Sequence, residues 1–341
     1  KNLEYVNKAK EKNLIANIKI NKYYASEINE YSIKIAKKNY PDTIELGDVR
    51  DLSVNQIEDK IDLIIGGSPC QSFSFVGHMD GMSTTENGER KEILTLEEYL
   101  NAKEKGFIFN GYSYLFWEYV RILKEVKPKY FLLENVNMTK HWENVITKAL
   151  GVEPIRINSS LFSAQNRNRL YWTNLPINDY PKDLNILLKS ILLQDVDFEN
   201  VGDALTVQKS LPKLQKKYGY IPKMFNAYNI SEITEKSPTL SLGSMVTSSC
   251  ATTIFIQNEK GNYTVKNKKI NINNNEYNTN LDDGKYILRK LTPRECERLQ
   301  TLPENYTEGV SDSQRYKMIG NGWTVDAIKW ILNHYPSEEE N

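Results

Sequence analysis

The chain has 341 residues, of which 40% are hydrophobic, and its 44 Lys and Arg residues balance its 44 Asp and Glu residues. This length suits one large or two medium domains, and a neutral net charge excludes a global signature of nucleic-acid binding, so any such surface must come from local segregation of charge. We expect a soluble, cytoplasmic protein, since no membrane-spanning run or secretory leader is evident; three scattered cysteines exclude a disulfide framework, and three separated histidines predict no metal site.

Strands and helices alternate over the first half of the chain. The apolar run IDLIIGG (61–67) predicts a parallel strand that is buried on both faces. The other elements predicted from periodicity are strands over 18–27, 43–49 and 130–136 and helices over 28–40 and 112–126. This alternation predicts a doubly wound α/β sheet, in which ligands bind beyond the carboxyl ends of the strands. Four reactive side chains lie at such ends and should share one rim: Glu27, Asp48, Cys70 and Glu134.

Two segments depart from this alternation. Residues 177–285 are polar and turn-rich, which predicts a second, smaller and irregular domain with long loops. Residues 86–106 read as a charged insertion with its own short helix, capped by Thr95 together with Glu98 and ended by Gly106.

Helical signals return near the end of the chain. In LTPRECERLQTLP (291–303), Thr292 is predicted to cap a helix whose capping box is completed by Glu295. A last helix is predicted over 324–335, directly after a Gly-Asn-Gly turn.

The segment IIGGSPCQSFSFVG (64–77) places Cys70 on a turn at the end of an apolar strand. A lone cysteine is most often a structural core residue, and that alternative stays open for Cys70. The Gly-Gly-Ser-Pro turn would, however, present the thiol at the rim of the sheet. Polar Gln71, Ser72 and Ser74 follow, as a nucleophile and its substrate contacts require.

Two further polar motifs follow apolar strands. Glu134 and Asn135 come at the end of YFLLENV, where they either end a strand in a turn or place a carboxyl group beside the cysteine. Gln165, Arg167 and Arg169 alternate on a predicted strand and should face one side. Two guanidinium groups on one face suit an anion or a base, and the alternative is an exposed strand edge with solvated arginines.

In this order, these motifs resemble the signature of the cytosine-5 DNA methyltransferases. The matching segments are Pro69-Cys70-Gln71, Glu134-Asn135-Val136, Gln165-x-Arg167-x-Arg169, RKLTPRECERLQTLPENY (289–306) and IGNGWTVDAI (319–328). The resemblance covers about residues 23–175 and 287–335. The Asn-Gly-Trp-Thr-Val variant is similar to prokaryotic and phage members related to the animal de novo enzymes.

The resemblance implies a Rossmann-like methyltransferase fold with a doubly wound mixed sheet. Residues 1–175 plus 286–341 would form the catalytic domain, and 176–285 a smaller, irregular target-recognition domain. The implied methyl donor is S-adenosylmethionine, and the implied partners are double-stranded DNA and a cognate restriction enzyme. The implied cofactor-binding residues are Glu27, Asp48, Val49, Pro69, Asn321, Trp323 and Val325.

The resemblance also implies the chemistry. Cys70 would add to carbon 6 of a cytosine, and Glu134 would stabilise the protonated ring nitrogen. Arg167 would hold the cytosine carbonyl and help to position the cysteine, with Arg169 as an organiser of that network. The target atom is unreachable in a stacked duplex, so the base must be flipped out, and residues 72–85 would form the loop that closes over it.

Contacts with DNA are expected from both parts of the chain. Residues 207–223 carry five lysines and no acid, which suits phosphate contact by Lys213 and Lys216, although a solvated lysine-rich loop explains the same pattern. Thr239-Leu240 resembles a Thr-Leu pair of the family's recognition region. At the cysteine turn, the expected DNA contacts are Gln71, Ser72 and Ser74.

One departure keeps alternatives open. The family opens with a strand and a Phe-x-Gly-x-Gly loop around the cofactor, whereas residues 1–22 contain no glycine, so this segment is missing, disordered or lost. Its loss would leave a catalytically silent DNA-binding subunit. The transfer-RNA branch of the family is a second alternative, against which stand the large 177–285 region and the lack of a Cys-Phe-Thr tripeptide.

Overall fold

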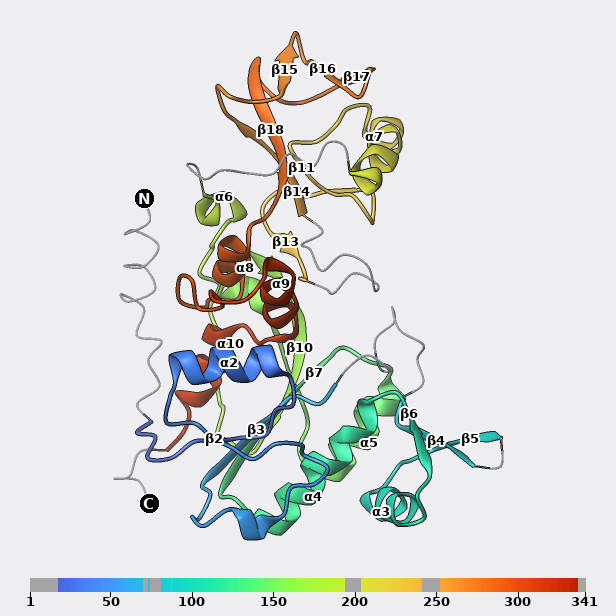
Figure 1. The fold of residues 1–341 in the computed structure, drawn as a ribbon, viewed down its shortest axis with the longest axis vertical. Coiled ribbons are helices and arrows are strands. Elements are labelled where there is room, and N and C mark those ends of the chain that lie inside the picture. The colour runs from blue at the N-terminus through green and yellow to red at the C-terminus, as the bar shows by residue number, and fades with distance from the viewer. Residues whose placement is uncertain are drawn as a thin grey trace. The chain divides into compact units, whose positions relative to one another are not determined.

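The computed structural model describes residues 18–69, 73, 81–86, 88–193, 204–240 and 252–336, which form a mixed α/β fold (Figure 1). With these gaps, the described residues divide into two compact units. The first unit contains residues 18–158, 168–180 and 330–336, and the second contains residues 159–167 and 181–329.

A four-stranded mixed sheet lies in the first unit. In spatial order its strands are β3 (Leu63–Gly66), β7 (Tyr130–Val136), β10 (Asn168–Thr173) and β8 (Ile155–Asn158). β3 and β7 are parallel, whereas β10 is antiparallel to both β7 and β8. β1 (Tyr24–Ala25) and β2 (Ile44–Glu45) form a separate parallel pair. The sequence therefore predicted the mixed α/β class and the two apolar strands β3 and β7. The strands predicted over 18–27 and 43–49 are much shorter in the structure, where β1 and β2 have two residues each.

Two helices, α4 (Phe116–Val126) and α5 (Lys140–Leu150), pack against this sheet through one apolar core. The unit also contains the helix α2 (Glu30–Asn39). The side chain of Asn29 caps α2 by accepting the backbone N–H groups of Tyr31 and Ser32, and Pro41 follows its end, as predicted. The core joins fully buried side chains of α4, α5 and the sheet, among them Phe116, Trp117, Val120, Leu133, Ile146 and Trp172.

The predicted charged insertion, 86–106, lies within a larger module of the first unit that extends from Ser83 to Asn110. This module contains the antiparallel sheet β5-β4-β6 and the helix α3, which lie together beside α4 (Figure 1). The bounds are β4 (Ser83–Glu86), β5 (Glu89–Glu92), α3 (Leu96–Glu104) and β6 (Ile108–Asn110). The predicted capping box of Thr95 and Glu98 is present, and Gly106 has a φ of 69° after the helix. Tyr99 and Ala102 of α3 belong to the same apolar core as α4, so the module is anchored by packing.

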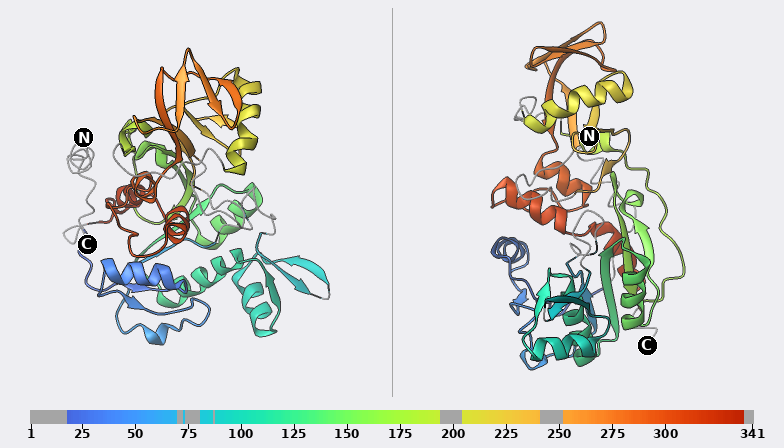
Figure 2. Two further views of the ribbon diagram at one scale, coloured as in Figure 1. Left: turned by 45° about the horizontal axis from the view of Figure 1, so that its top comes forward. Right: turned by 90° about the vertical axis from the view of Figure 1, so that its right-hand side faces the viewer.

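The second unit contains a seven-stranded antiparallel sheet (Figure 2). In spatial order its strands are β12 (Ser231–Glu232), β11 (Met224–Asn226), β14 (Thr252–Gln257), β18 (Gly284–Lys290), β15 (Tyr263–Lys266), β16 (Lys269–Ile272) and β17 (Asn275–Asn278). The helix α7 (Leu205–Tyr218) packs on this sheet through Val207, Leu211 and Leu214. Phe255 and Leu288 of the sheet share that apolar cluster.

This regularity corrects the expectation of an irregular second region. Two hairpins turn at residues with left-handed backbone: Asn267 and Lys268, with φ of 54° and 59°, and Asn273 and Asn274, with φ of 52° and 61°. Two consecutive residues of this kind form the tight turn that matches strand twist, and asparagine tolerates it well. The Asn-rich stretch is thus a set of hairpin turns. Likewise, the lysine-rich segment is a helix and not a loop.

The three helices that follow β18 complete the second unit. They are α8 (Pro293–Leu299), α9 (Asp312–Asn321) and α10 (Val325–Leu332), the last of which extends into the first unit at Trp330. Thr292 and Glu295 form the predicted capping box of α8, with Pro293 at the first turn.

The short elements of the two units are η1 (Val54–Gln56), η2 (Ser113–Leu115), η3 (Ser159–Leu161), α6 (Leu188–Ile191) and the parallel pair β9 (Gln165–Asn166) and β13 (Ser237–Pro238).

We expect Gly66→Ala to destabilise the protein, because a Cβ at this position would lie 2.6 Å from two ring carbons of Tyr119. Overpacking of this kind costs about 1–3 kcal/mol, which a urea denaturation curve would show as a lower midpoint. Tyr119→Leu should relieve the clash, so the Gly66→Ala cost should shrink in that background. Additive costs of the two substitutions would contradict this explanation.

Candidate active site

The parallel pairing of β3 with β7 brings two of the predicted motifs to one edge of the sheet. Gly66 lies opposite Leu133, so the turn at 67–69 and the pair Glu134 and Asn135 follow at neighbouring strand positions. The remaining predicted residues of the cysteine turn lie outside the described residues: Cys70, Gln71, Ser72 and Ser74. The described part of the motif therefore ends at Pro69.

Two buried side chains hold this turn. The Asn135 amide donates to Ser68 Oγ at 3.0 Å and to the Ser68 carbonyl at 3.4 Å. Ser113 Oγ donates to the Pro69 carbonyl at 2.9 Å. Asn135 and Ser113 are each 1% exposed. The two residues before Cys70 are thus held from two elements, Ser68 from β7 and Pro69 from the segment that begins α4.

A carboxylate–guanidinium pair lies at the end of β7. Glu134 Oε1 and Arg169 Nε are 2.9 Å apart, and their side chains are 11% and 12% exposed. The antiparallel register of β10 with β7 sets this contact, because Arg169 lies opposite Val136 and Tyr171 opposite Glu134. Arg169 Nη1 also donates to the Asn168 carbonyl at 2.8 Å. A largely desolvated pair of this kind holds both groups in defined positions.

Arg167 has different partners. Its side chain is 3% exposed and donates to the carbonyls of Leu240 at 3.4 Å, Gly320 at 3.3 Å and Gly322 at 2.9 Å. The expectation that Gln165, Arg167 and Arg169 face one side of one strand was wrong. The strand breaks at Arg167, which separates β9 from β10, so Gln165 and Arg167 belong to the second unit and Arg169 to the first.

Gln300 organises the Gly-Asn-Gly-Trp-Thr turn in the second unit. Its side-chain nitrogen donates to the carbonyls of Ile319 at 2.9 Å and Gly322 at 3.1 Å. Its side-chain oxygen accepts the Thr324 hydroxyl at 2.7 Å, and Thr324 is also 2.7 Å from Ser159 Oγ. The side chains of Gln300, Thr324 and Ser159 are all buried. Gln300 and Arg167 therefore fix this turn through its carbonyls.

Among the predicted cofactor residues of this turn, Asn321 is exposed, whereas Trp323 and Val325 are half-buried. The Val325 N–H donates to the Gln300 carbonyl, and the adjacent Gly322 N–H donates to the Met318 carbonyl, so the turn is closed at both ends. The Asn321 side chain is therefore accessible, and that of Trp323 is partly accessible.

The other predicted cofactor residues lie where the parallel strands β1 and β2 end. Glu27 Oε1 accepts the backbone N–H groups of Ile28 and Asn29 at 2.8 and 2.9 Å, which leaves Oε2 available among the described residues. Asp48 is paired with Arg50, and this contact lowers the pKa of the Asp48 carboxyl group. Two carboxyl groups with spare acceptor capacity fit the hydroxyl and amine donors of an adenosine group. Val49 is half-buried beside them.

The predicted DNA contacts of the second unit divide into two kinds. Lys213 and Lys216 are exposed on α7. Leu240, in contrast, is 7% exposed within an apolar cluster, and its N–H and carbonyl are bound by Gln165 and Arg167. Thr239 donates its hydroxyl to the Asn166 carbonyl at 2.7 Å. The Thr-Leu pair is thus tied to the segment that carries the arginines.

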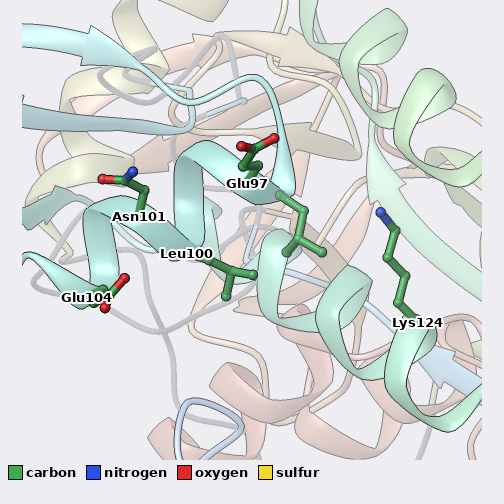
Figure 3. Close-up of a pocket in the computed structure, with 6 residues that line it drawn as sticks. Glu97, Leu100, Asn101, Glu104 and Lys124 are labelled. Carbon is green, nitrogen blue, oxygen red and sulfur yellow. The ribbon is translucent and has the colours of Figure 1, made fainter.

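An open groove lies between α3 and α4 and is lined by Leu96, Glu97, Leu100, Asn101, Glu104 and Lys124 (Figure 3). It contains none of the predicted site residues. Within the described ranges, no three His, Cys, Asp or Glu side chains are grouped to hold a metal ion. No helix in the same ranges has the length and apolar character needed to cross a membrane.

The fold and these strand-end residues define an α/β enzyme with a cysteine turn and an ion pair at one sheet edge, and comparisons with known proteins identify the family. Residues 13–336 match the family described as C-5 cytosine-specific DNA methylase. The chain therefore belongs to this family of DNA (cytosine-5) methyltransferases, which use S-adenosylmethionine.

Bacterial and phage proteins are among its relatives. The type II methyltransferase M1.ScrFI of Lactococcus lactis subsp. cremoris is 27% identical over 92% of this chain and 71% of its own length. M.HhaI of Haemophilus parahaemolyticus is 25% identical over 90% and 85%, and the orphan methyltransferase M.SPRI of Bacillus phage SPR is 25% identical over 90% of each chain.

Solved structures support the fold. The Entamoeba histolytica methyltransferase EhMeth superposes with a TM-score of 0.60 and 14% identity, covering 97% of this chain and 93% of its own. DNMT2 of Spodoptera frugiperda gives a TM-score of 0.58 and 18% identity, covering 97% and 96%.

Sequence reasoning missed several residues that shape the site. Gln300, Ser159 and Ser113 carry no local signal of function, because each acts on a segment far away in sequence. Gln300 lies inside the resembling block at 289–306, which was the one available indication.

We expect Asp326→Asn to preserve or raise stability at neutral pH. Asp326 is the second residue of α10, after Val325, and is 9% exposed; burial raises the pKa of its carboxyl group, while Lys329 at 3.4 Å partly opposes this. A carboxyl whose pKa is higher in the folded state loses folding free energy as the pH rises past its unfolded pKa. The advantage of Asp326→Asn should therefore vanish in acid, and urea denaturation from pH 4 to pH 7 would measure it. If Asp326→Asn lost stability relative to the parent protein as the pH rises from 4 to 7, this assignment would be contradicted.

Proposed function

We propose that the chain methylates carbon 5 of a cytosine flipped out of double-stranded DNA, with Cys70 as the covalent nucleophile. The observation that carries this proposal is the buried Glu134–Arg169 pair, which lies on β7 and β10 at the sheet edge where the turn toward Cys70 begins. Asn135, next to Glu134, holds that turn directly. The carboxylate and the cysteine turn are therefore coupled through adjacent residues of one strand.

The proposed chemistry follows from these residues. The Cys70 thiolate adds to carbon 6 of the cytosine, and the ring electrons make carbon 5 nucleophilic. Glu134 hydrogen-bonds the ring nitrogen that gains a proton in this step. Carbon 5 would take the methyl group as the methyl–sulfur bond of the donor breaks, leaving a neutral thioether. Carbon 5 then loses its proton to water, the thiolate leaves carbon 6, and the ring nitrogen gives up the proton that it gained. S-adenosylmethionine supplies an electrophilic methyl group when it is bound.

The two arginines receive different roles in this proposal. Arg169 is the guanidinium that contacts Glu134, so we assign the contact with the cytosine carbonyl to Arg169 and no longer to Arg167. Arg167 donates to three backbone carbonyls and is assigned to hold the turn at Gly320–Gly322. Arg167 is thus a positioning residue.

The proposed cofactor-binding residues form two groups, the strand-end acids of the first unit and the Gly-Asn-Gly turn of the second. Glu27 would bind the ribose hydroxyls through its available oxygen, and Asp48 with Val49 would contact the adenine edge. The remaining proposed contacts are Pro69, Asn321, Trp323 and Val325.

We also propose the division of labour along the chain. Residues 1–175 with 286–341 would form the catalytic, Rossmann-like domain, and 176–285 the target-recognition domain. The separate apolar cluster of α7 and the seven-stranded sheet supports this division. Exposed Lys213 and Lys216 of α7 would contact phosphates, and Gln71, Ser72 and Ser74 would contact DNA at the cysteine turn. A cognate restriction enzyme would be the functional partner.

A mechanism-based trap tests the nucleophile. Duplex DNA of random sequence with 5-fluorocytosine at every cytosine should form a denaturant-resistant complex with the protein and S-adenosylmethionine, because fluorine cannot leave as a proton does. Cys70→Ser should abolish the complex while keeping calorimetric binding of the cofactor. If the protein binds the cofactor but forms the complex only with 5-fluorocytosine RNA and not with DNA, the DNA assignment is wrong. If it binds no cofactor and forms no complex with either nucleic acid, a silent DNA-binding subunit is favoured.

The roles of the arginines are separable by substitution. Arg169→Lys keeps the charge but loses the planar fork, so kcat should fall by about 100-fold with little change in the melting temperature. Arg167→Lys should instead lower the melting temperature and weaken cofactor binding, since buried carbonyls lose donors. Single-turnover methylation and thermal unfolding measure both. A large kcat loss in Arg167→Lys at unchanged stability and cofactor affinity would restore Arg167 as the catalytic arginine.

A further inference from the structure

The turn that presents Asp48 and Val49 is held from outside by two long cationic side chains. Arg121 of α4 donates through Nη2 to the carbonyls of Val49 at 3.1 Å and Leu52 at 2.9 Å. Lys103 of α3 donates through Nζ to the carbonyl of Arg50 at 2.8 Å. Three carbonyls of this short turn are thus bound by cations of the first unit, one of which comes from the charged insertion.

A buried carboxylate holds these two cations in place. Glu118 of α4 is 0% exposed and lies 2.5 Å from Lys103 Nζ and 2.6 Å from Arg121 Nε. The hydroxyl of Tyr99, also on α3, donates to the same carboxylate. Burial and the charge of Glu118 raise the pKa of Tyr99, so its hydroxyl remains a donor. A buried carboxylate requires such partners, and together they lock α3 to α4.

Arg50 links these backbone contacts to the Asp48 carboxylate. The Arg50 side chain is bound to Asp48, with Nε 3.0 Å from Oδ1 and 2.9 Å from Oδ2, and the Arg50 N–H donates to Oδ1 at 2.9 Å. The Asp51 N–H closes the turn on the Asp48 carbonyl at 3.0 Å. Lys103 therefore binds the backbone carbonyl of Arg50, the same residue whose N–H and side chain bind Asp48.

We propose that the inserted module of β4, β5, β6 and α3 braces the cofactor site, with Lys103 as the positioning residue that transmits this support to Asp48 and Val49. The proposal rests on the proposed function, in which these two residues contact the adenine edge of the methyl donor. It assigns to the insertion a role in cofactor affinity. Rigid placement of the turn before binding lowers the ordering cost that binding would otherwise incur.

Lys103→Met tests the proposal, with Lys103→Arg as the conservative variant and Lys124→Met as the matched control. Lys124 lines the groove between the same two helices and has no described contact with the turn (Figure 3). We expect Lys103→Met to weaken S-adenosylmethionine binding and raise its KM by about five- to tenfold, with kcat and the KM for DNA within about twofold of the parent. Lys103→Arg should recover most of the affinity, and Lys124→Met should match the parent.

Two measurements separate positioning from general stability. Calorimetry gives the cofactor dissociation constant without turnover, and amide hydrogen exchange in the cofactor-free protein should show faster exchange at residues 48–52 in Lys103→Met. An unchanged dissociation constant in Lys103→Met, or an equal loss in kcat and both KM values with a lower melting temperature, would overturn the brace.

Asp48→Ala distinguishes a failure of the brace from a failure of the proposed cofactor site. If Asp48→Ala loses affinity while Lys103→Met does not, only the brace fails. If Asp48→Ala binds the cofactor like the parent, the proposed placement of the adenine edge fails and the inference fails with it.

Discussion

The parallel pairing of β3 with β7 is the constraint on which the rest of the site depends. It places the end of one apolar strand, which leads to Cys70, beside the end of another, which carries Glu134 and Asn135. Asn135 then fixes the turn before the cysteine, and the antiparallel partner of β7 delivers Arg169 to Glu134. The cysteine turn, the pair Glu134 and Asn135, and Arg169 lie far apart in the sequence. Their chemistry becomes available only through strand register, so a packing requirement such as the close approach of Tyr119 to Gly66 has consequences for function.

Two buried glutamates, Glu295 and Glu118, join segments that are far apart in the sequence. Glu295 binds Arg289 through two contacts of 2.7 Å and also accepts the N–H groups of Thr292 and Leu193, which joins α8 to a segment about a hundred residues earlier. Glu118 does the same for α3, α4 and the turn after β2. Replacing such groups by apolar residues is often neutral or stabilising, so stability alone does not explain their presence. Their directional contacts instead give each of these segments fixed hydrogen-bond partners.

Local sequence signals predicted what local physics controls. The capping residues of α3 and α8 and the apolar runs of β3 and β7 agree with the structure, because each depends on neighbours within a few residues. The hairpins at Asn267–Lys268 and Asn273–Asn274 were missed because these pairs lack the glycine that usually marks such turns. Gln300 was missed for a different reason, since its partners lie about 20 residues away and on another helix. Of the candidate site, residue types and order were predictable, but not the partner of each side chain.

The two arginines illustrate that distinction. Alternation along a strand requires an unbroken strand, yet β9 pairs with β13 in one unit and β10 pairs with β7 and β8 in the other. Arg167 falls between them, where it meets carbonyl groups, and Arg169 falls within β10, where it meets a carboxylate. A guanidinium group suits both surroundings, because its five donors can bind several carbonyls or grip one carboxylate. The motif therefore combines two demands in one short segment: Arg167 ties this segment to the Gly320–Gly322 turn, while Arg169 completes the charged pair at the end of β7.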